Sequence, residues 1–250
     1  MIRRIWLFFV KSLALAIAFL TPTDFEFLLR RTLTKKLQVL SATEGLALLF
    51  RIDTLLYSLQ SLTAVHYGNF KHSKHRLTTY HDFFIERIEA EDKVLNFGTG
   101  KGSVAHDIAV RTGAHVDGID ISKENIELAR RDKNHQLVRF FHGDGLRFAF
   151  DSDYDVVVLS NVLEHINDRP GLLKSLVAST NARRFLIRVP TYQRDWRVAL
   201  KRELDIEWRL DLDHKTEYTP ESFAFEVQTA GLSIRYLEVK WGEIWSELAV

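Results

Sequence analysis

The feature that most constrains this chain is a short apolar run that breaks into alternating glycines, Val94-Leu95-Asn96-Phe97-Gly98-Thr99-Gly100-Lys101-Gly102. Glycine has no Cβ, so it allows a tight turn and lets a ligand lie against bare backbone. Residues 103–111 then follow a helical pattern, and the N–H groups at a helix start face whatever lies before it. We therefore expect a strand, a ligand-facing turn and a helix. Glycines at this spacing are weak evidence for a particular ligand when they stand alone.

The chain beyond this turn alternates between strand and helix patterns. Residues 154–159 contain four consecutive apolar residues, as do parallel strands that are buried on both faces. Pro170 suits a helix start and Gly231 suits a helix end. Seven strands are expected, at 94–95, 114–119, 137–141, 154–159, 184–189, 232–239 and 244–250. Their alternation with helices predicts right-handed crossovers in a doubly wound α/β sheet.

The N-terminal part shows helical spacing instead. Helices are expected at 24–40 and 43–62, followed by a turn at 66–70 and a further helical pattern at 77–88. No Gly/Pro/Ser-rich linker separates these segments from the strands. We therefore expect a helical segment over residues 1–65 that caps a domain over residues 66–250.

The first twenty residues leave three interpretations open. Their apolar stretch is interrupted by Lys11 and falls short of the roughly twenty residues that span a bilayer. An interfacial or buried helix is favoured over a spanning anchor and over a cleaved signal peptide, because Thr21-Pro22-Thr23 is a poor cleavage site. Residues 1–40 carry seven basic and two acidic side chains, which suits peripheral contact with an anionic membrane leaflet. The expected location is cytoplasmic, at the inner face of the membrane.

Composition excludes several classes of protein. The chain has no cysteine, which excludes a disulfide framework, thiolate metal ligands and a cysteine nucleophile. Its formal net charge of +1 gives no support for general nucleic-acid binding. Four histidines gather without carboxylates at ligand spacing, so a solvated or cofactor-facing basic segment is favoured over a metal site at His66, His72, His75 and His81.

Three strand ends carry what an adenosine cofactor needs. The first offers Gly98-Thr99-Gly100. The second offers Asp120, at a spacing from which a carboxylate can accept both ribose hydroxyls. The third offers Asp144, which can accept a hydrogen bond from an exocyclic amine. The alternative is that the acidic residues only form caps and turns. A dinucleotide fingerprint is disfavoured because it would need glycine at position 103, where the chain has serine.

This combination resembles the class I S-adenosylmethionine (SAM)-dependent methyltransferases over roughly residues 73–250. The resemblance also rests on Gly143-Asp144-Gly145 and on Ser160-Asn161-Val162-Leu163-Glu164-His165-Ile166-Asn167-Asp168, which looks like the small-molecule branch of the family. It implies a seven-stranded Rossmann-like sheet, mostly parallel with an antiparallel last strand. It also implies SAM as cofactor and S-adenosylhomocysteine (SAH) as product.

The resemblance also implies roles for individual residues. Gly98, Thr99 and Gly100 would pass beneath the methionine part of SAM. Asp120 would hold the ribose and Ile121 would cover one adenine face, while Asp144 with Gly145 would meet the adenine amine. Asn161 and Val162 would border the sulfonium, and Tyr80 and Asn96 would lie at the amino-acid end. Asn96 departs from the family, which usually has an acid there, so the charge that orients the SAM amino group is missing.

Residues for the acceptor side follow the fourth and fifth strands. By family analogy Glu164 and His165 face the transferred methyl, and His165 titrates in the range useful for a general base, although a structural role is the alternative. Arginine with aromatic residues suits a sugar, carboxylate or phosphate, so the substrate candidates are Tyr192, Arg194, Trp196 and His214. A packed surface loop is the alternative for them. No metal ligands are expected.

The favoured function is SAM-dependent methylation of a small-molecule or glycan acceptor, with oxygen as the expected acceptor atom and lipid-linked glycans included. A quinone or lipid methyltransferase at the membrane is the first alternative. A degenerate, non-catalytic SAM-binding scaffold is the second, with Asn96 as the lesion. A nucleic-acid methyltransferase is disfavoured, because no Asn/Asp-Pro-Pro-aromatic tetrapeptide follows the fourth strand.

Overall fold

A computed structural model describes residues 2–68, 73–148 and 153–250 of the chain. By its internal contacts the chain divides into two compact units, Met1–Leu59 and Gln60–Val250.

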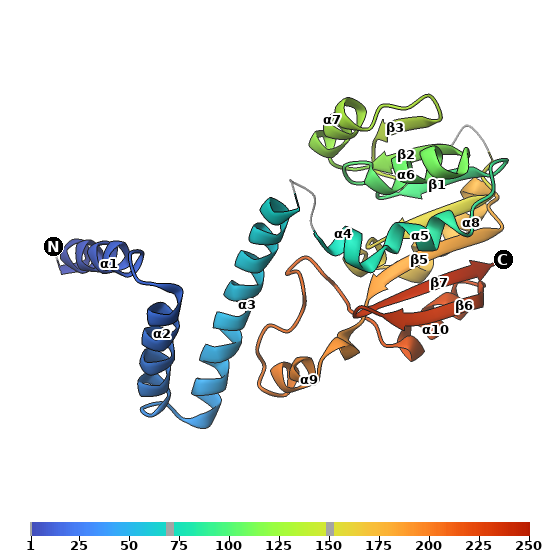
Figure 1. Cartoon of the computed structure of the whole chain (residues 1–250). Coiled ribbons are helices and arrows are strands. Elements are labelled where there is room, and N and C mark those ends of the chain that lie inside the picture. The colour runs from blue at the N-terminus through green and yellow to red at the C-terminus, as the bar shows by residue number, and fades with distance from the viewer. Residues whose placement is uncertain (1, 69–72, 149–152) are drawn as a thin grey trace. The chain divides into compact units, whose positions relative to one another are not determined.

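The first unit is helical. It contains α1 (Ile2–Ile17), α2 (Pro22–Leu37) and most of α3 (Ala42–Tyr67), whose last turns belong to the second unit (Figure 1). The Thr21 hydroxyl accepts a hydrogen bond from the Asp24 N–H and caps α2, and Ser41 and Glu44 bond each other's backbone N–H groups at the start of α3. None of the described helices is long and apolar enough to cross a bilayer.

The second unit is built on one seven-stranded sheet of order β3-β2-β1-β4-β5-β7-β6. β7 runs antiparallel to β5 and β6 on either side of it, whereas β1 to β5 pair in parallel, which confirms the fold predicted from the sequence. Strand order reverses between β1 and β4, where an open α/β sheet places its ligand site. The strands are β1 (Lys93–Phe97), β2 (His115–Asp120), β3 (Val138–His142), β4 (Val156–Ser160), β5 (Arg184–Pro190), β6 (Ser233–Lys240) and β7 (Glu243–Ala249).

Alternate residues of the central strands feed two apolar layers, because successive side chains of a strand point to opposite faces. In β4, Val157 and Leu159 join the layer under α8 (Arg169–Thr180) and α10 (Pro220–Thr229). Val156 and Val158 join the opposite layer, with residues of α5 (Tyr80–Ile85), α6 (Ser103–Thr112) and α7 (Lys123–Asp132). This two-sided burial fixes the sheet and its carboxyl-end edge.

Three details of the helices differ from the sequence predictions. The pattern at 77–88 is two short helices, α4 (Ser73–Thr78) and α5, because Thr79 takes a left-handed conformation with φ of 47°. The turn expected at 66–70 begins later, since α3 continues to Tyr67; residues 69–72, including His72, lie outside the described residues. Short helices after β4 and β5 were not predicted: η1 (Leu163–His165), η2 (Tyr192–Arg194) and α9 (Trp196–Glu203).

Candidate cofactor and acceptor site

A cavity of about 710 Å³ opens at the carboxyl ends of the strands. It is lined by the β1–α6 turn, by the residues that follow β2, β3 and β4, and by α5. All the cofactor-binding residues predicted from the sequence line this one cavity: Tyr80, Asn96, Gly98, Thr99, Gly100, Asp120, Ile121, Asp144, Gly145, Asn161 and Val162. Its size lies within the range of small-molecule and cofactor sites.

The glycine turn combines close packing with bare backbone. Gly98, Gly100 and Gly102 have φ angles of 68°, 54° and 77°, a region that side chains disfavour. A Cβ on Gly98 would lie 2.6 Å from Val162 Cγ2, and one on Gly102 would lie 2.6 Å from Phe140 Cζ. A Cβ on Gly100 would meet nothing within 4 Å. Gly100 is therefore the position where the backbone itself faces the cavity.

Asp120 is fixed at the end of β2 by backbone donors. Its Oδ2 accepts a hydrogen bond of 2.8 Å from the Gly100 N–H, and its Oδ1 accepts one of 2.8 Å from the Ser122 N–H. Ser122 in turn caps α7 by accepting from the Asn125 N–H. The carboxylate thus ties the glycine turn to the start of α7 and keeps further lone pairs for a ligand.

The residues that follow β2 and β3 also line the cavity. Ile121 is 72% exposed although it is a large apolar residue, which suits a side chain that covers a flat ligand face. Asp144 accepts a hydrogen bond from the Leu146 N–H, and its second oxygen lies 3.6 Å from Arg147 Nε. Gly145 packs against the Phe97 ring.

Asn96 is buried at the end of β1 and its amide is engaged within the protein. Its Oδ1 accepts a 2.7 Å hydrogen bond from the Thr99 hydroxyl, and its Nδ2 donates to the Val158 carbonyl at 3.4 Å. The side chain therefore braces the glycine turn against β4. This bracing accounts structurally for an uncharged residue at the position.

Arg188 is a cavity residue whose role the sequence did not indicate. It comes from β5, is only 5% exposed, and its guanidinium carbon lies 3.7 Å from the centre of the Tyr80 ring. Its Nε donates to Asn161 Oδ1 at 3.1 Å and lies 3.4 Å from the buried carboxylate of Glu243. Lys74 reaches the other oxygen of Glu243 at 2.7 Å. The sequence signal that could have marked it is an arginine within the apolar run that follows Arg184 in β5.

Tyr80 and His75 complete this wall of the cavity. The Tyr80 hydroxyl and His75 Nδ1 lie 3.0 Å apart, and burial raises the pKa of the Tyr80 hydroxyl. Next to them, His81 Nδ1 lies 2.6 Å from Asp107 and lowers the pKa of that carboxyl to about 2. His75 is therefore part of the cavity wall, and His81 lies behind that wall.

Glu164 and His165 lie on η1, directly after β4. His165 lines the cavity, and burial, followed by the nearby His214, lowers its pKa. Glu164 is fully buried behind it, and among the residues that the structure describes neither of its oxygens has a hydrogen-bond partner. Burial raises the pKa of Glu164 to about 8.

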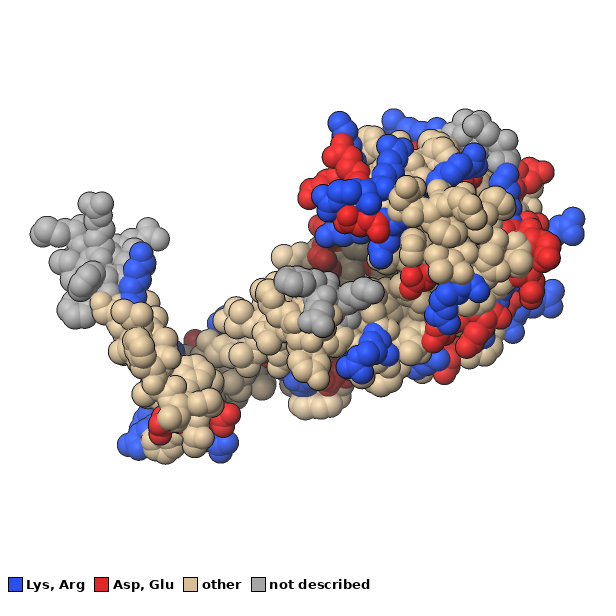
Figure 2. Space-filling view, turned by 45° about the horizontal axis from the view of Figure 1, so that its top comes forward, with Lys and Arg blue, Asp and Glu red and all other residues tan. Residues whose placement is uncertain are grey.

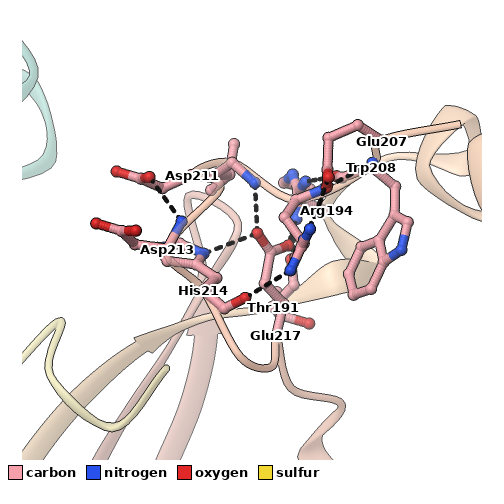
Figure 3. A network of polar contacts seen from close by, with 10 residues as sticks. Thr191, Arg194, Glu207, Trp208, Asp211, Asp213, His214 and Glu217 are labelled. Atoms are coloured by element: carbon pink, nitrogen blue, oxygen red, sulfur yellow. Dashed lines mark hydrogen bonds and ion pairs between the residues drawn. The ribbon is translucent and has the colours of Figure 1, made fainter. Parts of the chain in front are cut away.

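The four predicted substrate residues do not line this cavity. Arg194 donates to the Thr191 and Trp208 carbonyls and pairs with the buried carboxylate of Glu217, so it holds the loop together (Figure 3). Trp196 is 74% exposed. The rings of Tyr192 and Trp208 lie 6.3 Å apart. His214 is buried against Glu217, with its ring 4.9 Å from that of His165.

Comparison with known proteins identifies the family. A family profile described as "Methyltransferase domain" matches residues 69–237, more than half of the chain. The chain belongs to the class I SAM-dependent methyltransferases. SAM is accordingly its cofactor.

Two groups of curated relatives resemble this methyltransferase. A ubiquinone biosynthesis O-methyltransferase from Aeromonas salmonicida is 28% identical over 155 residues, which cover 57% of this chain and 63% of the relative. A demethylmenaquinone methyltransferase from Tropheryma whipplei is 36% identical over 89 residues, 34% of this chain and 36% of the relative. The chain thus matches less than two thirds of either relative's length.

Solved structures show the same fold. The putative methyltransferase from Haloferax volcanii, solved with its Trm112 activator, superposes with a TM-score of 0.58 at 17% identity, covering 73% of this chain and 93% of that one. Magnesium protoporphyrin IX methyltransferase from Synechocystis, solved with bound SAH, gives 0.57 at 15% identity, covering 70% and 82%.

The cavity of this methyltransferase fits SAM in two respects. Gly100 offers bare backbone beside open space, and the Asp120 carboxylate faces the same space from the neighbouring strand end. SAM supplies a methyl group activated by a sulfonium. In such an in-line displacement the main tasks of the protein are to hold the cofactor, align the acceptor and exclude water.

Proposed function

We propose that this methyltransferase methylates a hydroxyl oxygen of a small acceptor with an apolar ring, of the kind represented by quinone precursors. The observation that carries the proposal is the composition of the acceptor end of the cavity. There, beside Asn161 and Val162, the wall combines the apolar Ile166 with the polar His165 and Asp213. Such a wall can pack against an apolar ring and form a hydrogen bond with a hydroxyl group on that ring. The names of the curated relatives, which refer to ubiquinone biosynthesis and demethylmenaquinone, support this acceptor class.

Methylation of a hydroxyl oxygen requires that this end of the cavity also handle a proton. The new O–C bond forms as the C–S bond breaks, the bonding pair stays with sulfur, and the hydroxyl proton must leave. His165 lines the cavity, and its imidazole can accept that proton as a general base. The buried strand ends around it limit access by water.

Charge on the second unit supports a small acceptor over a polyanion. On the face shown in Figure 2, Lys and Arg are interspersed with Asp and Glu over this unit. Nucleic-acid binding surfaces, by contrast, concentrate positive charge.

A second candidate, an acceptor taken from a bilayer, is favoured by the first unit. Its only buried side chains among those described are in α3, while large apolar residues of α1, α2 and the turn between them are exposed: Val10, Leu13, Leu15, Phe19, Phe25, Phe27, Leu28 and Leu29. Exposed apolar residues together with the basic charge of residues 1–40 suit peripheral contact with an anionic leaflet, at the cytoplasmic face of the membrane.

Transfer of a labelled methyl group from SAM tests both candidates. The panel pairs a catechol carrying a short isoprenoid tail with a demethylmenaquinone analogue and a reducing saccharide. The proposal predicts that the catechol becomes an O-methyl ether and that the saccharide does not react. Methylation of the saccharide alone would reject it. Deleting residues 2–40 should lower turnover only for a long-tailed acceptor in anionic vesicles, and equal loss on a water-soluble acceptor would reject the membrane candidate.

A further inference from the structure

Three side chains at the acceptor end of the cavity have the arrangement of a metal site. Glu164, His165 and His214 each offer one ligand atom, and these atoms lie within 4.8 Å of one another. Glu164 and His165 come from η1, whereas His214 comes from the loop between α9 and α10, about fifty residues further along the chain. The fold therefore brings together imidazoles that the sequence keeps apart.

The loop that carries His214 is held in place on η1. The Glu164 carbonyl accepts a 2.6 Å hydrogen bond from the Lys215 N–H. His214 Nδ1 lies 3.0 Å from Glu217 Oε1, which leaves Nε2 as the ring atom for a ligand (Figure 3). Glu217 is itself fixed by Arg194 and by the Leu210 N–H. A carboxylate that orients the second nitrogen of a histidine is the usual companion of a metal-bound imidazole.

The carboxylate of Glu164 is the observation that points to a ligand. The residue is 0% exposed, and neither of its oxygens has a hydrogen-bond partner in the described part of the chain. Burying a carboxyl group without partners costs roughly 1–3 kcal/mol or more, and native proteins rarely accept this cost without a compensating interaction. A cation between Glu164 and the two imidazoles would supply that interaction.

We propose that Glu164, His165 and His214 bind one divalent transition-metal ion. Two imidazole nitrogens and one carboxylate oxygen are the donor set of catalytic zinc sites and suit related first-row ions, whereas Mg²⁺ and Ca²⁺ prefer oxygen ligands alone. His165 and Asp213, the residue before His214, both line the cofactor cavity. The coordination positions of the ion that the protein does not fill therefore open toward the acceptor. The neighbouring acids Asp211, Asp213 and Glu217 add negative potential around the site.

The role of the ion rests on the function proposed above. Placed at the acceptor end, it would bind the hydroxyl oxygen, favour loss of the hydroxyl proton to water, and hold the oxyanion in line with the methyl group. His165 would then act as a ligand, which replaces its predicted role as a general base.

Titration of the metal-free full-length protein with Zn²⁺ and Co²⁺ tests the site without any acceptor. Calorimetry should show one equivalent bound, and Co²⁺ should give visible d–d bands. The variants Glu164→Gln, His165→Gln and His214→Gln should each weaken binding by more than the roughly 10–100-fold lost when a residue that merely orients a ligand is changed. The control is His115→Gln, an exposed histidine at the start of β2 and so at the opposite edge of the sheet.

The outcomes separate this site from the proposed reaction. Each variant is also titrated with SAH. Binding of SAH with the parental affinity shows that the variant is folded. No saturable binding of Zn²⁺ or Co²⁺, or equal loss in the His115→Gln control, would overturn the metal site. Metal binding without methylation of any hydroxyl acceptor would leave the site in place and reject the proposed function instead.

Discussion

Substitutions at two glycines of the β1–α6 turn should distinguish a role in ligand binding from a role in packing. Gly100 and Gly102 both have positive φ, so substitution by alanine strains the backbone by about 1–2 kcal/mol at either position. Only at Gly102 does the new methyl collide with the core, 2.6 Å from Phe140 Cζ and 3.0 Å from Ala129 Cβ, and such overpacking adds about 1–3 kcal/mol. Gly100→Ala should therefore cost about 1–2 kcal/mol in free energy of unfolding, and Gly102→Ala about 2–5 kcal/mol.

Cofactor affinity should follow the opposite order. The methyl of Gly100→Ala enters the cavity, where Gly100 approaches the ligand, whereas Gly102 does not line it. Urea unfolding gives the stability change, and calorimetry with SAH gives the dissociation constant. We expect Gly102→Ala to bind SAH as the parent does, and Gly100→Ala to bind it at least roughly tenfold more weakly, the equivalent of about 1.4 kcal/mol. Equal destabilisation by the two variants, or a larger loss of SAH affinity at Gly102, would refute this assignment of the turn.

Three further changes test other parts of the account. Asp120→Asn keeps the shape but removes the charge, so SAH should bind roughly 10–100-fold more weakly by calorimetry, since hydrogen bonds to charged groups contribute about 1.5–3 kcal/mol; unchanged affinity would contradict the ribose contact. Arg188→Met removes one of the two cations beside the buried Glu243, leaves it with Lys74 and the Trp245 indole N–H, and should lower the free energy of unfolding in urea by roughly 3 kcal/mol. Glu164 has its pKa raised to about 8, so in metal-free protein the folded state keeps a proton that the unfolded state loses above about pH 4.5. Stability from this group falls as pH rises from 4.5 to 8, and Glu164→Gln should remove that slope in thermal melts; a slope equal to the parent's would show that Glu164 ionises normally.

The sheet and the gathering of the cofactor-site candidates at one cavity could be predicted because their determinants are local in sequence. Glycine turns, strand-end acids and apolar strands each report on their own segment, and the doubly wound topology then brings the strand ends to one edge. That is why Gly98, Asp120 and Asp144, far apart in the chain, line one cavity.

The acceptor side could not be predicted to the same degree because it depends on contacts between distant segments. Nothing near Arg194 in the sequence shows that its guanidinium closes on Glu217 and the Trp208 carbonyl. The stacking of Arg188 on Tyr80 joins β5 to α5. The approach of His214 to Glu164 and His165 likewise depends on how one loop folds back onto η1.

The central claim is that one edge of the sheet presents the bare backbone at Gly100 and the carboxylate of Asp120 to the same nucleoside. A crystal structure of the protein with SAH tests this most directly. The account predicts ribose hydroxyls within hydrogen-bond distance of Asp120, with the homocysteine chain passing over Gly98 and Gly100. SAH bound elsewhere, or in this cavity with its ribose away from Asp120, would contradict it.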